Sequence, residues 1–200
     1  MTMPAIVPTL TPEAYLDMDR KAELKSEYLD GEVVAMSGAS LAHNLIAWNI
    51  GLSVRNQLGE RPCTVLGMDM RVRVDRSAYT YPDLAVVCGE IEVEDDQGDT
   101  LLNPTVIVEV LSPSTEGYDR GEKFRRYRRI PGLRHYVLVA QDAAWVEVFT
   151  RQGDMWVYAD AEGLDASIAL DAIGCTLALG NVYAKVPLTA SPTRSPTAQA

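Results

Sequence analysis

The stretch TVIVEVLSPS, residues 105–114, decides how the rest of this sequence is interpreted. Its β-branched and aliphatic residues are typical of a strand buried in a core, yet Glu109 lies among them. An ionised carboxylate in apolar surroundings costs several kcal/mol unless it is paired, hydrogen-bonded or bound to a cation. The sequence therefore predicts a partner for Glu109 elsewhere in the chain.

A second carboxylate, Asp83, follows a proline at the start of the apolar strand YPDLAVVC. Two carboxylates on adjacent strands suit a hard divalent cation such as magnesium, which takes oxygen ligands and keeps waters that a phosphate can displace. The alternative is a structural ion pair between Glu109 and Arg71, Arg73 or Lys123. The residues by themselves leave both interpretations open, and Asp83 after a proline also suits a simple hydrogen-bonding residue at a strand start.

Length and composition favour one globular domain. The chain has 200 residues, of which 47% are hydrophobic, enough for one sizeable core. No apolar run reaches the roughly 18 to 20 residues of a membrane span, and the N-terminus lacks the pattern of a signal peptide, so we expect a cytoplasmic protein without a membrane partner. We expect the domain to occupy residues 1–186, followed by a disordered tail of Pro, Ser, Thr and Ala over residues 187–200.

The cysteines and histidines limit the kinds of metal site. Cys63, Cys88 and Cys175 are odd in number and widely spaced, so we expect three reduced packing residues. His43 and His135 are the two histidines, which excludes a polyhistidine site. Any metal would be held by oxygen.

The formal charge of -10 is unevenly distributed. Between Arg120 and Arg134 lie seven basic residues and one acid, a segment of +6 that leaves -16 for the rest. Such a basic island can contact a polyanion, although a solvated helix face is the simpler interpretation. The negative charge of the rest of the chain argues against a protein that coats nucleic acid through its whole surface.

Local patterns place these residues on a sheet with two long helices. Thr11 and Pro12 predict the start of a short helix. Ser40 is expected to cap a second helix that runs to about Leu58 and stops at Gly59. This second helix has apolar residues on two faces, so a second subunit is one candidate for covering its outer face. An Asp30-Gly31 turn joins two strands, and the second of them is expected to end near Ser37. Further strands are expected over 68–75, 81–88, 105–111, 135–140, 144–150 and 154–160, and a helix over 120–130 with Asp119 and Glu122 as its capping box. The predicted fold class is α/β or α+β.

The order and spacing of several pieces resemble one family. YPDLAVV, then PTVIVEVLSPST, then YDRGEKFRRYRRIPGLRHYVLV, with SEYLDGEVVAMSGASLAHN before them, resemble the Uma-two family of restriction endonucleases in the PD-(D/E)XK nuclease superfamily. The resemblance runs from about residue 10 to 185. It implies a restriction-endonuclease-like core, a mixed β-sheet flanked by helices.

The resemblance also implies roles for individual residues. Asp83 and Glu109 match the two acids of the motif and, with the backbone carbonyl of Val110, would hold Mg²⁺ or Mn²⁺. Leu111 stands where the motif normally has lysine, so Lys123 resembles a lysine that has migrated to the following helix.

Two further positions match the family as supporting residues, namely Glu27 and His43. Glu27 is equally typical of an exposed strand residue, and His43 of a helix-packing or dimer-interface residue. Tyr118 and Tyr127 are expected to line the core or a groove rather than to act in catalysis.

The implied activity is metal-assisted hydrolysis of DNA phosphodiester bonds. We also expect a homodimer, because the helix from Ser40 has a spare apolar face and cutting both strands usually needs two active sites. The arginines of the basic island are candidates for DNA contact, namely Arg120, Arg125, Arg126, Arg128 and Arg129. Two other functions remain possible interpretations of the sequence. One is a binding or assembly module on the same fold whose activity is weak or lost, and the other is a hydrolase of another phosphate-containing substrate.

Overall fold

The main sheet of the protein has six strands in a mixed arrangement. The computed structural model describes residues 10–36 and 38–188, so Ser37 and nearly all of the predicted tail lie outside the described residues. The sheet has the order β11-β10-β9-β8-β6-β3, made of β3 (Cys63–Gly67), β6 (Leu84–Cys88), β8 (Val106–Val110), β9 (His135–Val139), β10 (Trp145–Gln152) and β11 (Met155–Glu162). β8 and β9 are parallel, and the other neighbours are antiparallel.

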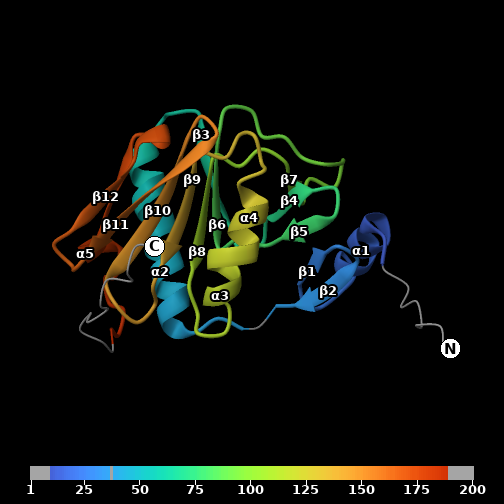
Figure 1. Ribbon diagram of the computed structural model, residues 1–200, viewed down its shortest axis with the longest axis horizontal. Coiled ribbons are helices and arrows are strands. Elements are labelled where there is room, and N and C mark those ends of the chain that lie inside the picture. The colour runs from blue at the N-terminus through green and yellow to red at the C-terminus, as the bar shows by residue number, and fades with distance from the viewer. Residues whose placement is uncertain (1–9, 37, 189–200) are drawn as a thin grey trace.

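Helices cover both faces of this sheet (Figure 1). α2 (Leu41–Leu58) packs on the face that carries Val106, Val108 and Val110. On the opposite face lie three short helical segments in succession, namely α3 (Glu116–Tyr118), η1 (Asp119–Lys123) and α4 (Phe124–Tyr127). Ile107 and Tyr127 share a core on this second face. Successive side chains of β8 therefore enter two different cores, which explains its nearly continuous apolar sequence. Of the predicted α/β or α+β class, the structure confirms a mixed α+β architecture with a mixed sheet flanked by helices.

One of the two apolar stripes of α2 packs on the main sheet, and the other does not. The Ser40 hydroxyl accepts the His43 N–H at 3.0 Å and begins the helix as predicted. Ile46, Ile50 and Val54 pack on the sheet, whereas Trp48 is 76% exposed. The second apolar stripe therefore faces outward in the single chain.

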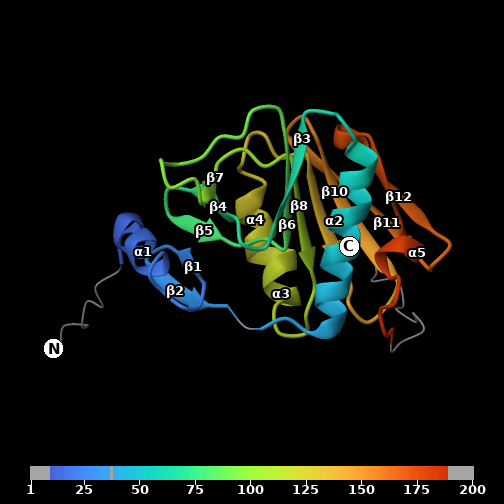
Figure 2. The same ribbon diagram turned by 180° about the vertical axis from the view of Figure 1, so that it is seen from behind.

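The N-terminal part forms a second, five-stranded sheet beside the first (Figure 2). Its order is β2-β1-β5-β4-β7, with β1 (Ser26–Leu29), β2 (Glu32–Ala35), β4 (Arg71–Asp75), β5 (Ala78–Thr80) and β7 (Thr100–Leu101), and α1 (Pro12–Asp19) packs on β1. Asp30 and Gly31 form the predicted turn with φ of 50° and 94°, and this left-handed backbone suits Asp and Gly.

The strand predicted over 68–75 differs from the expectation in length and in its polar face. β4 begins only at Arg71, and Arg71 is buried rather than exposed. Its Nη2 lies 2.8 Å from Oδ2 of buried Asp19, at the end of α1. The alternating pattern predicts a half-exposed strand because the sequence does not reveal that Asp19 of α1 lies against this face.

The helix predicted over 120–130 is displaced. Helical backbone begins at Glu116 and ends at Tyr127, with one π-helical turn, η1, in the middle. Asp119 has helical backbone angles and a buried side chain, so it is not the N-cap that the capping-box pattern predicted. The Asp119 carboxylate instead faces Lys123, one turn along the helix.

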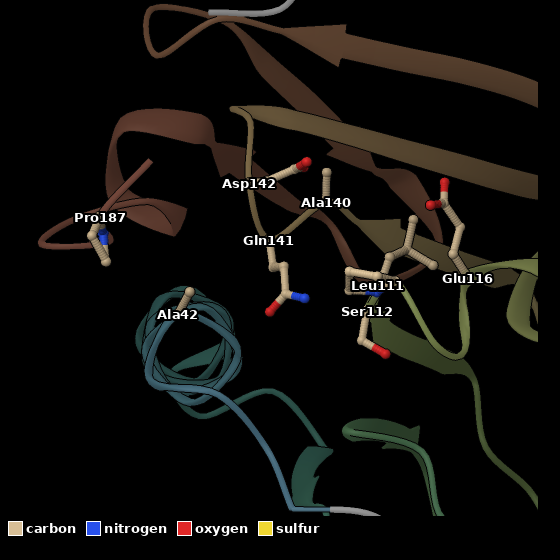
Figure 3. A pocket seen from close by; sticks show the side chains of 9 residues that line it. Ala42, Leu111, Ser112, Glu116, Ala140, Gln141, Asp142 and Pro187 are labelled. Carbon is tan, nitrogen blue, oxygen red and sulfur yellow. The ribbon is translucent and has the colours of Figure 1, made fainter. Parts of the chain in front are cut away.

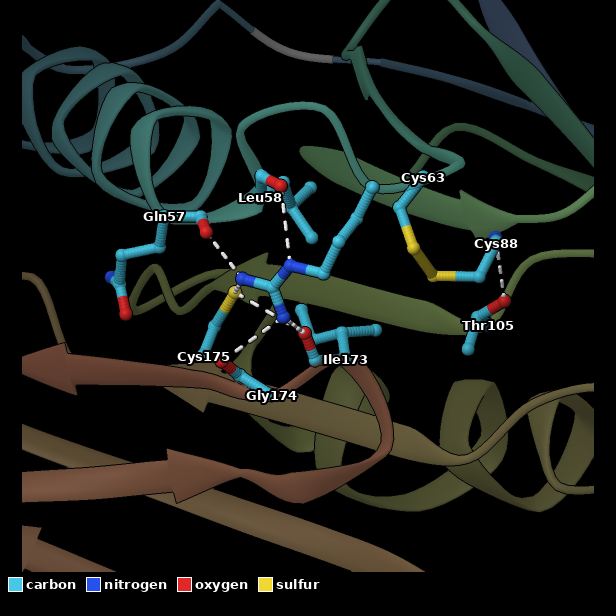
Figure 4. The surroundings of a disulfide bond; sticks show 9 residues. Gln57, Leu58, Cys63, Cys88, Thr105, Ile173, Gly174 and Cys175 are labelled. Carbon is cyan, nitrogen blue, oxygen red and sulfur yellow. Dashed lines mark hydrogen bonds between the residues drawn. A yellow bond between two sulfur atoms is a disulfide. The ribbon is translucent and has the colours of Figure 1, made fainter.

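The expectation of three reduced cysteines is wrong for two of them. Cys63 and Cys88 lie directly opposite each other on the antiparallel strands β3 and β6, with Cα atoms 4.0 Å apart, and form a disulfide (Figure 4). Their separation of 25 residues concealed this pairing in the sequence. Cys175 is free and buried, as expected.

A C-terminal hairpin closes the α2 side of the molecule. It consists of β12 (Ser167–Leu170), η2 (Asp171–Ile173) and β13 (Cys175–Ala178), followed by α5 (Leu179–Val182). Arg61, just after α2, donates from Nη1 to the carbonyl oxygens of Ile173 at 2.6 Å and Gly174 at 3.2 Å (Figure 4). Within the described residues, no helix is long and apolar enough to cross a membrane.

Candidate active site

Strand register brings the two predicted acids together. β6 and β8 pair with Leu84 opposite Val108, so the next position along places Asp83 opposite Glu109. Asp83 Oδ2 accepts the main-chain N–H of Val110 at 2.7 Å, which fixes this carboxylate against β8. The candidate site therefore lies where β6 begins and β8 ends.

Lys123 reaches the site from its helix. Its Nζ lies 2.9 Å from Glu109 Oε1, 3.1 Å from Glu27 Oε1 and 3.6 Å from Asp119 Oδ1. The Lys123 side chain is 7% exposed, so these contacts occur away from bulk water. Glu109 thus has the partner that its burial required.

The two other partners considered for Glu109 are engaged elsewhere. Arg71 pairs with Asp19, and Arg73 Nη1 lies 2.8 Å from Glu94 Oε1. The structural ion pair considered from the sequence is therefore formed by Lys123.

The second sheet contributes Glu27. This residue lies on β1 and is buried, and its Oε1 accepts the N–H of Tyr81 at 3.1 Å. Tyr118 donates from its hydroxyl to Glu27 Oε2 at 3.4 Å. The alternative of an exposed strand position does not describe Glu27, because both of its oxygens face the site.

His43 approaches the site from the first turn of α2. Its Nε2 lies 3.1 Å from Asp83 Oδ2, while its Nδ1 is buried without a hydrogen-bond partner among residues 10–36 and 38–188. Sequence reasoning brought together Glu27, His43, Asp83, Glu109 and Lys123, and the structure places all five side chains in one cluster.

Besides Tyr118, three side chains of this cluster were not predicted as site residues. Tyr127 donates to Glu109 Oε1 at 3.1 Å, and the Thr80 hydroxyl lies 2.8 Å from the Tyr127 hydroxyl. The third is Asp119, for which a signal existed: it lies four residues before Lys123, the spacing at which side chains of one helix face meet. The capping-box interpretation concealed that signal.

The cluster carries more negative than positive charge. Burial raises the pKa of Glu109 well above its usual range, with the neighbouring carboxylates Asp119, Asp83 and Glu27 adding to the effect and Lys123 opposing it. Burial likewise raises the pKa of Asp119. Burial disfavours the charged form of Lys123, but Glu109 and Glu27 outweigh it and hold the lysine pKa well above its usual range. Three carboxylates thus contact one ammonium group, an arrangement that a further cation would stabilise.

The donor set fits a magnesium ion better than a transition metal. Among the described residues, no group of three or more His, Cys, Asp or Glu side chains is arranged to hold a metal. Magnesium commonly uses only one or two carboxylates, with waters and substrate phosphate completing its shell. Asp83, Glu109 and the Val110 carbonyl are oxygen donors of the kind that magnesium takes, so these are the groups that could hold the cation.

A hollow of about 220 Å³ lies next to this cluster, beyond the ends of the parallel strands β8 and β9 (Figure 3). Its walls come from Ala42 on α2, from Leu111 and Ser112 after β8, and from Gln141 after β9, whose amide extends into the space between them. Asp83, Glu109 and Lys123 are not part of its lining. The hollow is thus bordered by Ala42 and Leu111, the chain neighbours of His43 and Val110, and does not itself hold the carboxylates.

The basic island divides into engaged and exposed arginines. Arg126 is buried and pairs with Asp30 and Glu122, and Arg120 pairs with Glu116 and buried Glu147. These two guanidinium groups hold the helix against the rest of the molecule.

The three remaining candidates lie at the surface. Arg125 pairs with Glu122 at 2.7 Å, and Arg129 Nη1 lies 3.4 Å from Asp75 Oδ2. Arg128 is exposed and forms no ion pair within the described ranges. The exposed arginines are therefore the ones available to a polyanion.

The overall fold matches that of a solved nuclease-like protein. A crystal structure described as "a putative nuclease belonging to DUF820" from Anabaena variabilis ATCC 29413 superposes with a TM-score of 0.72, covering 87% of this chain and 97% of that chain at 17% sequence identity. The two proteins thus share one fold.

The chain belongs to the Uma2 family, described as "Putative restriction endonuclease", whose sequence pattern matches residues 12–180. Two relatives from Synechocystis sp. (strain ATCC 27184 / PCC 6803 / Kazusa) support this assignment. "Uncharacterized protein sll1609" is 35% identical over 170 residues, covering 84% of this chain and 96% of its own length. "Uncharacterized protein slr1290" is 34% identical over 178 residues, covering 88% of this chain and 92% of its own length.

Proposed function

We propose that this protein is a Mg²⁺- or Mn²⁺-dependent endonuclease that hydrolyses phosphodiester bonds of DNA. The observation that carries the proposal is the contact of 2.9 Å between Lys123 Nζ and Glu109 Oε1, with Asp83 on the neighbouring strand. It places a lysine beside the acid pair although Leu111 occupies the usual lysine position. Membership of the Uma2 family supports nuclease chemistry.

The resemblance to the family motif suggests a role for each residue. Asp83, Glu109 and the Val110 carbonyl would hold the metal, which when bound polarises the scissile phosphate and lowers the pKa of a water molecule. Lys123 orients the attacking water and offsets the negative charge that develops on the phosphate.

Two supporting roles fall to Glu27 and His43. His43 steadies Asp83 through the contact of 3.1 Å between Nε2 and Oδ2. Glu27 holds the second side of the lysine and is placed to accept from an outer water.

Plasmid cleavage tests the proposal. The purified protein should nick or linearise supercoiled plasmid with Mg²⁺ or Mn²⁺, and Asp83→Ala or Glu109→Gln should abolish this activity. Glu147→Gln is a matched control, because Glu147 is also a buried strand glutamate but pairs with Arg120 outside the site. Equal cleavage by wild type and both acid variants would refute the assignment.

The alternative is a binding or assembly module whose catalytic activity is weak or lost. It is favoured by the close engagement of Lys123 with three carboxylates, which is also what a structural ion cluster requires. Calorimetric titration with Mn²⁺ distinguishes the two, since the nuclease requires metal binding that Asp83→Ala removes. Cleavage of other phosphodiesters but not of DNA would instead indicate a hydrolase of a different phosphate-containing substrate.

We also propose that the protein forms a homodimer through the outer stripe of α2. Leu41, Trp48 and Leu52 are exposed apolar side chains on that helix, and two active sites would serve the two strands of a duplex. Light scattering should give twice the chain mass, and Trp48→Glu should reduce it to one chain mass. A wild-type protein that stays monomeric at high concentration would contradict the dimer.

A further inference from the structure

A second hollow lies between the helix that carries Lys123 and the turn that joins β10 to β11. Its volume is about 380 Å³, and it is lined by Arg125, Arg128, Arg129, Arg151, Asp154 and Trp156. None of these residues contacts the carboxylate cluster. Four guanidinium groups around one open space are the chemical signature of a site for an anion.

Arg151 is held rigidly in this hollow. Its Nε donates to the carbonyl of Leu133 at 2.9 Å, and its Nη2 donates to the carbonyls of Ile130, at 3.0 Å, and Arg128. Its Cζ lies 4.7 Å from the centre of the Trp156 ring. A guanidinium group that is already fixed loses little conformational entropy when an anion binds.

These contacts satisfy only part of the Arg151 donor set. They explain Arg151 as a residue that caps the carbonyls after α4, but Nη1 forms no hydrogen bond anywhere in the described chain. The capping role also leaves Arg128 unexplained, because that side chain is exposed.

The positive charge of the hollow is incompletely compensated. Arg125 is matched by Glu122, and Arg129 lies near Asp75. Neither Arg128 nor Arg151 has a carboxylate within 4 Å in the ranges that the structure describes, and burial together with nearby Arg134 lowers the pKa of Arg151. A bound anion would relieve this crowding of charge.

The position of the hollow relative to Lys123 indicates what the anion is. The main-chain N–H of Arg151 donates to the Arg134 carbonyl, four residues before Leu138, which lies opposite Glu109. At about 3.3 Å per residue, the hollow is about 13 Å along the strands from the carboxylate that contacts Lys123. Phosphates of one strand advance about 3.4 Å per nucleotide along a duplex. A strand whose phosphate lies at Lys123 can therefore present another phosphate, a few nucleotides away, to Arg128.

We propose that the hollow formed by Arg128, Arg151 and their neighbours binds a backbone phosphate of the nucleic acid, a few nucleotides from the phosphate at Lys123. This inference rests on the proposed nuclease function and extends it with a second contact on the same strand. Arg151 supplies a donor held by three backbone carbonyls and Arg128 an exposed one, while Asp154 limits the affinity by its negative charge.

Duplex binding in EDTA tests this site without cleavage. Affinity for a fluorescently labelled 20-base-pair duplex is measured by anisotropy from low to moderate salt. Arg128→Gln should weaken binding about five- to tenfold and reduce the slope of log K against log salt by about 0.9, as expected for one lost phosphate contact. Asp154→Asn should strengthen binding, a gain that a folding defect cannot imitate, and Asn suits a hairpin turn.

Arg55→Gln is the matched control. Arg55 is an exposed arginine on α2, which covers the opposite face of the main sheet, and glutamine can still donate to the Gly59 carbonyl that Arg55 contacts. Its affinity and salt slope should equal those of the wild type. If Arg128→Gln and Asp154→Asn also behave like Arg55→Gln, the phosphate site is refuted.

The two proposals fail in different ways. Asp83→Ala should bind the duplex as the wild type does and lose only cleavage. A wild type that cleaves plasmid while Arg128→Gln binds normally would refute the hollow and retain the nuclease. A protein that shows the Arg128 and Asp154 effects but cleaves nothing would retain the phosphate site and refute the nuclease. A wild type that binds no duplex at low salt refutes the phosphate site, whatever its activity on plasmid.

Discussion

Replacing Lys123 by methionine tests the central interaction of the candidate site. Methionine is a flexible side chain of comparable length, so it leaves little cavity while removing the ammonium group. In the native protein this group contacts the carboxylates of Glu109, Glu27 and Asp119 at 2.9, 3.1 and 3.6 Å. Lys123→Met leaves these buried carboxylates without their cation.

The expected loss of stability follows from the burial of the pair. Removing one partner of a buried salt bridge typically costs about 3 to 5 kcal/mol, because the remaining charge is uncompensated. Glu109→Gln should cost less, because Lys123 keeps Glu27 and Asp119 as partners. The double variant should be more stable than the sum of the two single losses predicts, by about 1 to 3 kcal/mol.

Urea unfolding at pH 7 in EDTA measures these free energies. The deficit of Lys123→Met should shrink on acidification, because burial already holds the folded-state pKa of Glu109 above its unfolded value and Lys123 opposes that shift. A carboxyl group with a raised folded pKa penalises the fold above that pKa, and the penalty disappears as the pH falls through it. A Lys123→Met loss below about 1 kcal/mol, or single losses that add within about 0.5 kcal/mol, would refute the reasoning.

Three other groups give independent predictions. Burial lowers the folded-state pKa of His135, so its contribution to stability is complete above about pH 6.5 and is lost as the pH falls. His135→Gln should therefore flatten the dependence of the unfolding free energy on pH between about pH 7 and pH 5. An unchanged pH dependence would exclude this role. The hydrogen bond from Arg20 holds the pKa of Asp99 at about 2, so Asp99→Asn should cost about 1 kcal/mol at pH 7, after allowance for partial exposure. This cost should be lost as the pH falls through about 2, and thermal unfolding at pH 7 and below pH 2 checks this. Reduction of the bond between Cys63 and Cys88 should cost about 3 kcal/mol by loop-closure entropy, and the double alanine variant should not respond to reductant; equal midpoints with and without reductant in the wild type would contradict it.

Local chemistry made much of the fold predictable. The Ser40 cap, the Asp30-Gly31 turn and the apolar strand around Glu109 depend on neighbouring residues, and the structure confirms all three. Local chemistry also misled where two signals competed. Asp119 has the spacing of an N-cap to Glu122 and of a helix-face neighbour to Lys123, and its burial decides for the second.

Long-range pairing could not be read from the chain. Cys63 and Cys88 meet because β3 and β6 are antiparallel neighbours, and Arg71 is buried because α1 supplies Asp19. Neither contact leaves a local trace, since each depends on the register or packing of elements far apart in the sequence.

The sequence by itself determined that Glu109 needs a partner, because a buried carboxylate cannot remain uncompensated. It also determined that Asp83 and Lys123 were candidates, since their positions follow the order of the family motif. Only the tertiary structure decided that Lys123 reaches Glu109 from its own helix, that Glu27 joins from a second sheet, and that Arg151 meets Arg128 across a hollow. These contacts depend on strand register and on the rotation of a helix about its axis, which are fixed when the separate cores pack together.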